Sequence, residues 1–112
     1  MTLYLRVHPD DPQPRLIEQA AAALREGGVI AYPTDSYYAL GCRVDSKEGQ
    51  ERIRVLRQLP REHDLSLLCR DLSELAQYGR VDDAAYRLLR RLTPGPYTFI
   101  MRATREVPRR LL

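Results

Sequence analysis

The stretch GGVIAYPTDSYYALG, residues 27–41, decides how this chain is interpreted. A pair of glycines precedes a short apolar run, residues 29–32, which predicts a buried strand. A proline ends that strand, and the polar and aromatic residues up to Tyr38 predict a loop. Ligands bind in open α/β sheets at the carboxyl ends of strands, where small hydroxyl residues stand in this sequence. Thr34 and Ser36 are therefore candidates to hydrogen-bond a small polar substrate, with Tyr38 packing beside it.

The same loop is also consistent with a simple turn. Asp35 and Ser36 are residue types whose side chains bond to the neighbouring backbone in turns. From the residues alone, substrate binding and a purely local turn both stay open.

The elements around this loop alternate between helices and strands. Apolar residues at helical spacing, each run with a capping or stop signal, predict helices over residues 15–24, from Asp45 or Ser46 to about 58, 72–78 and 82–92. Alternating or short apolar runs predict strands over residues 3–7, 29–32, 40–44, 65–69 and 97–102. This order predicts an α/β or α+β protein with a mixed sheet.

Length and composition indicate a cytosolic protein of one domain. The chain has 112 residues, of which 44% are hydrophobic. No apolar run approaches the roughly 20 residues that a membrane span needs, and the first ten residues lack the features of a signal peptide. Cys42 and Cys69 form no close pair, so we expect two reduced thiols. The sequence contains no P-loop, dinucleotide fingerprint, histidine-rich metal motif or nucleophile elbow.

The basic residues favour phosphate ligands. Formal net charge is +3, the sequence pI is about 9.1, and 17 arginines stand against a single lysine, Lys47. Arginine grips phosphate with two parallel hydrogen bonds, so an arginine-rich face suits RNA or a nucleotide. A compositional bias of the whole genome would produce the same count, and that interpretation stays open.

One group of arginines is close enough in sequence to form a phosphate site. The group comprises Arg52, Arg54, Arg57 and Arg61, with Arg70 just past the next predicted strand. Helical spacing brings three of them to one side if the helix continues to Arg61. A solvated helix face is the alternative. His63, beside Asp64, is either half of a proton-transfer pair or a surface loop histidine.

Taken in order, several blocks resemble the YrdC/YciO family, and the resemblance covers nearly the whole chain. The matching blocks are residues 27–41, 53–60, 65–68 and 93–100, followed by Val107-Pro108. Residues 69–75 and 106–112 look most like the YciO branch. The first and last blocks are specific when they occur together.

The resemblance implies a fold and an activity. The implied fold is α/β, with a twisted, mixed and largely parallel sheet, flanking helices and a positively charged cleft. Synthases of the family condense threonine, bicarbonate and ATP into threonylcarbamoyl-adenylate, which then serves a tRNA adenosine. The implied ligands are therefore ATP, used as a substrate with magnesium, and RNA, either double-stranded or tRNA. No protein-bound metal and no membrane partner are expected.

The resemblance also assigns site residues. Thr34 and Tyr38 match the family's substrate-binding positions, and Ser36 stands where the family has a threonine that helps bind the amino acid. Arg57 and His63 are the implied contacts to the nucleotide or its phosphates. The synthases carry a Lys-x-Arg pair here, but this chain has Leu59 in place of the second basic residue. No catalytic residue is assigned.

Two further departures bear on the same sites. Asp64 replaces a proline of the synthases, and Leu68 replaces a histidine near the amino-acid site. The family's later arginine-containing strand and Ser-x-Asn motif do not occur in these residues. We therefore expect residues 1–112 to be the N-terminal part of a single YrdC-like domain, with an incomplete sheet.

The expected function is that of a cytoplasmic YciO-like, nucleotide- and double-stranded-RNA-associated protein related to the threonylcarbamoyl-AMP synthases of tRNA modification, with an altered ATP site. Two alternatives remain. One is a non-catalytic RNA-binding module, and the other is an inactive fragment of a synthase-like domain. Nothing in the sequence predicts the oligomeric state.

Overall fold

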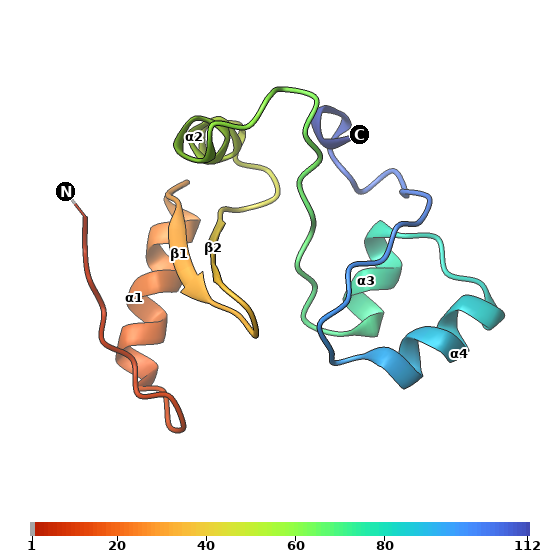
Figure 1. Cartoon of the computed structure of the whole chain (residues 1–112), viewed down its shortest axis with the longest axis horizontal. Coiled ribbons are helices and arrows are strands. Elements are labelled where there is room, and N and C mark those ends of the chain that lie inside the picture. The colour runs from red at the N-terminus through yellow and green to blue at the C-terminus, as the bar shows by residue number, and fades with distance from the viewer. Residues whose placement is uncertain (1) are drawn as a thin grey trace. The chain divides into compact units, whose positions relative to one another are not determined.

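The computed structural model describes residues 2–112 and combines helices with a small sheet (Figure 1). In chain order the elements are α1 (Pro14–Arg25), β1 (Ile30–Pro33), β2 (Tyr38–Gly41), α2 (Lys47–Arg57), α3 (Leu72–Tyr78), α4 (Asp83–Leu92) and the 3₁₀ turn η1 (Arg109–Leu111). The chain divides into two compact units, one ending at Arg61 and the other running from Glu62 to Leu112. Each unit is described by itself.

In the first unit, α1 leads directly into the hairpin. A proline opens the helix at its first position, where the missing N–H is no loss. After the helix, Gly27 has φ +86°, a left-handed conformation that favours glycine, and the N–H of Gly28 donates to the carbonyl of Ala23 at 2.9 Å. The predicted helix over 15–24 and its glycine stop are confirmed.

Strands β1 and β2 form an antiparallel hairpin. Their register runs from the pair Ile30 and Gly41 at the open end to the pair Pro33 and Tyr38 at the turn. A larger residue at position 41 would meet the Tyr32 ring, which lies 2.9 Å from where a Cβ on Gly41 would stand. The strand expected over 29–32 is confirmed in kind. Its side chains alternate between half-buried and exposed, however, so it is not a fully buried strand.

Helix α2 is tied to the start of the hairpin by one hydroxyl. Ser46 caps the helix by accepting the N–H of Gly49 at 3.0 Å, and its Oγ donates to the carbonyl of Gly27 at 3.3 Å. Ile53 is 7% exposed and supplies the buried apolar contact of this helix. The predicted helix is confirmed, and of the two caps that the sequence offered, Asp45 and Ser46, it is the serine that caps it.

The second unit contains two helices with aspartate caps. Asp71 accepts the N–H of Glu74 at 2.8 Å, and Asp82 accepts the N–H of Ala85 at 2.7 Å. Leu89, at 3% exposed, is the buried residue of α4. Both helices begin at the caps that the sequence predicted.

Three of the five predicted strands are wrong. Residues 3–7, 65–69 and 97–102 form no strand, although apolar side chains alternate in each segment. Leu3, Leu68 and Ile100 are 68%, 79% and 100% exposed. A strand is defined by hydrogen bonds to a neighbouring strand. Within residues 2–112 none of the three segments pairs with a neighbouring strand, and the isolated bridge between Gly79 and Ala103 lies just past the last of them.

The sheet is therefore smaller than expected. Among the described residues it has two strands in the order β1-β2, and β2 begins two residues before the extended stretch predicted from residue 40. The α/β class is confirmed, but the largely parallel character and the twist implied by the resemblance are not. None of the helices in residues 2–112 is long and apolar enough to cross a membrane.

Replacing Ser46 tests the link between α2 and the hairpin. We expect Ser46→Ala to lower the free energy of unfolding by about 1 kcal/mol, because the helix loses its cap. The bond to Gly27 is lost as well. Urea unfolding followed by circular dichroism measures the change. Lys47→Ala at the adjacent exposed position is the matched control, and an equal loss in both variants would contradict the role of the hydroxyl.

Candidate functional site

The turn between β1 and β2 gathers the residues expected to bind the amino acid. The Oγ1 of Thr34 donates to the carbonyl of Tyr37 and accepts the N–H of Ser36, the latter at 3.2 Å. The chain is thereby folded back within four residues, which is the local turn that the sequence left open. The sequence indicated Asp35 and Ser36 as the residues that would bond to the turn backbone, but the hydroxyl that does so belongs to Thr34.

The other polar and aromatic groups of this turn face solvent. Tyr38 is 75% exposed and Tyr37 is 84% exposed. Ser36 Oγ makes no hydrogen bond within residues 2–112. The structure thus brings Thr34, Ser36 and Tyr38 together at one tip, where the Thr34 hydroxyl is engaged in the turn and the Ser36 hydroxyl makes no hydrogen bond to the described residues.

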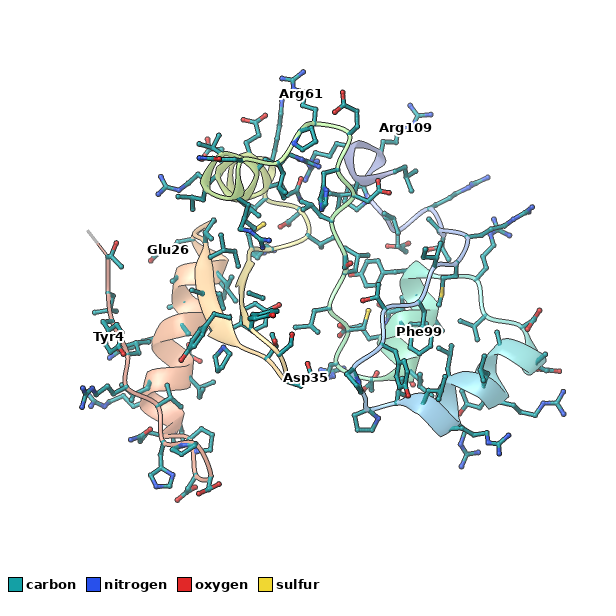
Figure 2. All side chains as sticks on the ribbon, in the orientation of Figure 1. Tyr4, Glu26, Asp35, Arg61, Phe99 and Arg109 are labelled. Carbon is teal, nitrogen blue, oxygen red and sulfur yellow. The ribbon has the colours of Figure 1, made fainter. Side chains whose placement is uncertain are left out.

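Arg57 lies in the same unit but elsewhere. It occupies the last turn of α2, whose N-terminus is bonded to Gly27 at the open end of the hairpin. Figure 1 shows α2 near that open end, and Figure 2 shows Asp35 at the opposite tip. No hydrogen bond or ion pair of the described residues joins Arg57 to the tip.

The expected alignment of Arg54, Arg57 and Arg61 on one helix face is wrong for Arg61. Gln58 follows α2 with φ 53°, a left-handed conformation that ends the helix, and the N–H of Leu59 then donates to the carbonyl of Arg54 at 2.8 Å. Arg61 therefore lies beyond the helix, on the segment that Figure 2 shows leaving it. Arg54 Nε is buried without a hydrogen-bond partner among the described residues.

His63 belongs to the second unit, which begins at Glu62. It is exposed in the loop that precedes residues 65–69, and no hydrogen bond with Asp64 is present. The proton-transfer pair considered from the sequence is therefore not formed in this loop.

Two cavities of the second unit were not predicted from the sequence. One, of about 310 Å³, lies between α3 and α4 against Tyr86. The other, of about 420 Å³, is lined by residues of two separate segments around Arg80 and Arg105. The first is lined by residues of two consecutive helices and the segment between them, and no sequence motif marks it. The second joins Arg80 to residues 103–112, which are more than 20 positions further along the chain.

Two ionisable groups near the start of α3, Cys69 and Asp71, have shifted pKa values. Burial raises the pKa of the Cys69 thiol, and the negative charges of Glu74 and Asp71 raise it further. The backbone N–H of Glu74 holds the pKa of Asp71 below its usual range, with Arg70 adding to the effect. The stabilisation from Asp71 is therefore present above its unfolded-state pKa and is lost as the pH falls through its lower folded-state pKa.

Comparison with known proteins finds a matching family and similar relatives. Residues 22–112 match the Sua5/YciO/YrdC family, described as "Telomere recombination". The chain is 57% identical over 112 residues to YciO of Escherichia coli strain K12, covering all of this chain and 54% of that protein. It is 39% identical over 101 residues to a threonylcarbamoyl-AMP synthase of Chromobacterium violaceum, covering 89% of this chain and 52% of the synthase.

Solved structures give the same relation. The crystal structure of E. coli YciO matches all of this chain and 54% of its own, at 57% identity and a TM-score of 0.93. A doubly substituted Sua5 of P. abyssi matches 91% of this chain and 32% of its own, at 26% identity and a TM-score of 0.84. The chain spans about half the length of the curated relatives it matches.

The raised pKa of Cys69 predicts slow alkylation. In a Cys42→Ser background, we expect the reaction of Cys69 with iodoacetamide to reach half its limiting rate at a higher pH than in the urea-unfolded chain, because only the thiolate reacts. Glu74→Gln should lower that pH, since it removes a negative charge while its side-chain oxygen still accepts the N–H of Arg70. Identical profiles for the folded and unfolded chains would contradict the assignment.

Proposed function

The chain belongs to the Sua5/YciO/YrdC family, and from that premise we propose that it supplies amino-acid and nucleotide contacts in a cytoplasmic YciO-like protein related to the threonylcarbamoyl-AMP synthases. The proposed ligands are threonine, ATP with magnesium, and RNA. The observation that carries the proposal is the hairpin tip, which gathers Thr34, Ser36 and Tyr38, the three residues to which the resemblance assigns substrate binding.

The tip offers chemistry suited to an amino acid. The hydroxyl of Ser36 both donates and accepts hydrogen bonds, so it serves either end of a zwitterion. Thr34 fixes the turn from which Ser36 projects, and the ring of Tyr38 supplies apolar contact for a short side chain. The proposal thus gives Thr34 a positioning role and Ser36 the direct contact.

The nucleotide contacts are proposed for Arg57 and His63. A phosphate near the C-terminus of α2 meets the negative end of the helix dipole, which opposes it by roughly 0.3–1 kcal/mol. A charge-assisted hydrogen bond from Arg57 contributes roughly 1.5–3 kcal/mol, so the arginine outweighs the dipole. Leu59 has no charge to add, and we therefore propose binding of ATP that is weaker than in the synthases.

Magnesium in this proposal arrives with ATP. In residues 2–112 no group of three or more histidine, cysteine or acidic side chains is placed to hold a metal ion. Magnesium commonly binds through substrate phosphates and water with few protein ligands, so a nucleotide substrate fits such a surface.

Titration with ATP and magnesium tests the nucleotide contact. We expect Arg57→Gln to weaken ATP binding about tenfold, the cost of one charge-assisted phosphate contact. Isothermal calorimetry measures the affinity. Lys47→Gln, which removes a positive charge from the first turn of the same helix, is the matched control and should bind as the unaltered protein does. Equal affinity for all three proteins would reject the role of Arg57.

A gain-of-function variant sharpens this test. Leu59→Arg restores the second basic residue of the synthase pattern and should tighten ATP binding by about the same factor. Pyrophosphate release from ATP, threonine and bicarbonate measures synthesis. Release by the unaltered protein at the rate of a synthase assayed beside it would show that Leu59 does not impair the site.

A second candidate function, a non-catalytic RNA-binding module, is favoured by the 17 arginines. Arginine contacts to RNA phosphates release counterions, so binding to a short RNA duplex should weaken steeply between 50 and 200 mM salt, by about tenfold or more for a few contacts. Fluorescence anisotropy measures this. An affinity that does not change with salt concentration would contradict binding through the RNA phosphates.

A further inference from the structure

The larger cavity of the second unit is built on a rigid backbone frame. Gly79 and Ala103 form an antiparallel bridge. On either side of it, Arg80 N donates to the carbonyl of Arg102 and Thr104 N donates to the carbonyl of Tyr78, both at 2.8 Å. Two chain segments are thereby held side by side, which fixes the backbone positions from which the neighbouring side chains extend.

Thr104 reinforces that frame and turns the chain towards the cavity. Its Oγ1 donates to the carbonyl of Gln77 and accepts the N–H of Glu106 at 3.3 Å. The N–H of Val107 also donates to the carbonyl of Thr104 at 3.3 Å. This compact turn places Arg105 on one side of the cavity and leads to Arg109 on η1, which Figure 2 labels.

The cavity itself has the size of a ligand site. Its volume is about 420 Å³, within the range of roughly 300–1,000 Å³ that is usual for ligand pockets. Its charged lining residues are Arg80, Arg105 and Arg109, and no acidic residue lines it. Val107 and Leu112 supply apolar contact.

The three guanidinium groups lack a counter-charge. The ion pairs of the described residues involve other arginines, Arg25, Arg43 and Arg70. Arg80, Arg105 and Arg109 make no side-chain hydrogen bond or ion pair within residues 2–112. Like charges around one cavity repel, and a bound anion removes that repulsion. Guanidinium groups suit phosphate because their N–H groups match its oxygens in pairs.

We propose that the cavity framed by Arg80, Arg105 and Arg109 is a binding site for phosphate groups. Its three arginines belong to the second unit, whereas Arg57 and the hairpin tip belong to the first. Its phosphate comes either from a free polyphosphate or from the backbone of an RNA, and the two sources present the same chemistry to the three arginines.

The test uses the 112-residue chain with two probes, inorganic tripolyphosphate and a short RNA duplex. We expect at least one probe to bind, and Arg105→Gln to weaken it about tenfold. The combined Arg80→Gln, Arg105→Gln and Arg109→Gln variant should abolish binding. Arg90→Gln, which removes an exposed arginine of α4 outside the cavity, is the matched control. Circular dichroism establishes that each variant keeps its helices.

Each outcome decides the proposal. Loss of tripolyphosphate binding in the combined variant identifies a free polyphosphate site, and loss of RNA binding alone identifies a backbone site. Binding that survives in the combined variant at the level of the Arg90 control, or no binding of either probe to the unaltered chain, overturns it. Should the combined variant unfold, shifts of the Thr104 and Arg105 amide signals in the unaltered chain decide instead, and unmoved signals reject the site.

Discussion

The ladder between β1 and β2 is the constraint on which the first unit depends. Its register pairs Pro33 with Tyr38, and this pair fixes the length of the loop that carries Thr34 and Ser36. A slip by one residue would exchange the two faces of each strand. It would also separate Thr34 Oγ1 from the carbonyl of Tyr37. The chemistry proposed for the tip therefore depends on the backbone pairing of the two strands that flank it.

The helices could be predicted from the sequence because their signals are local. Ser46, Asp71 and Asp82 each cap the helix that follows them, and each acts within three residues. The strands over 65–69 and 97–102 could not be predicted correctly, because alternation indicates only that a segment is able to pair. Pairing requires a partner, and the described residues provide one bridge, at Gly79.

One part of the candidate site could likewise be predicted from the sequence, and another part could not. Thr34, Ser36 and Tyr38 could be grouped from the sequence because five consecutive residues cannot be far apart. Grouping Arg57 with them depended on tertiary structure, and α2 places it towards the other end of the hairpin. The arginines around the larger cavity were missed because the bridge that unites them joins residues 24 positions apart, 79 and 103. No local sequence pattern indicates that two segments so far apart in the chain lie next to each other.

The aromatic composition of the hairpin tip makes it optically distinctive. The chain has seven tyrosines and no tryptophan, and two of those tyrosines, Tyr37 and Tyr38, stand exposed beside the Ser36 hydroxyl. With no tryptophan in the sequence, the intrinsic fluorescence of the chain comes from its tyrosines, and these two contribute to it. A small molecule bound beside their rings would therefore alter part of the tyrosine emission, without an added dye.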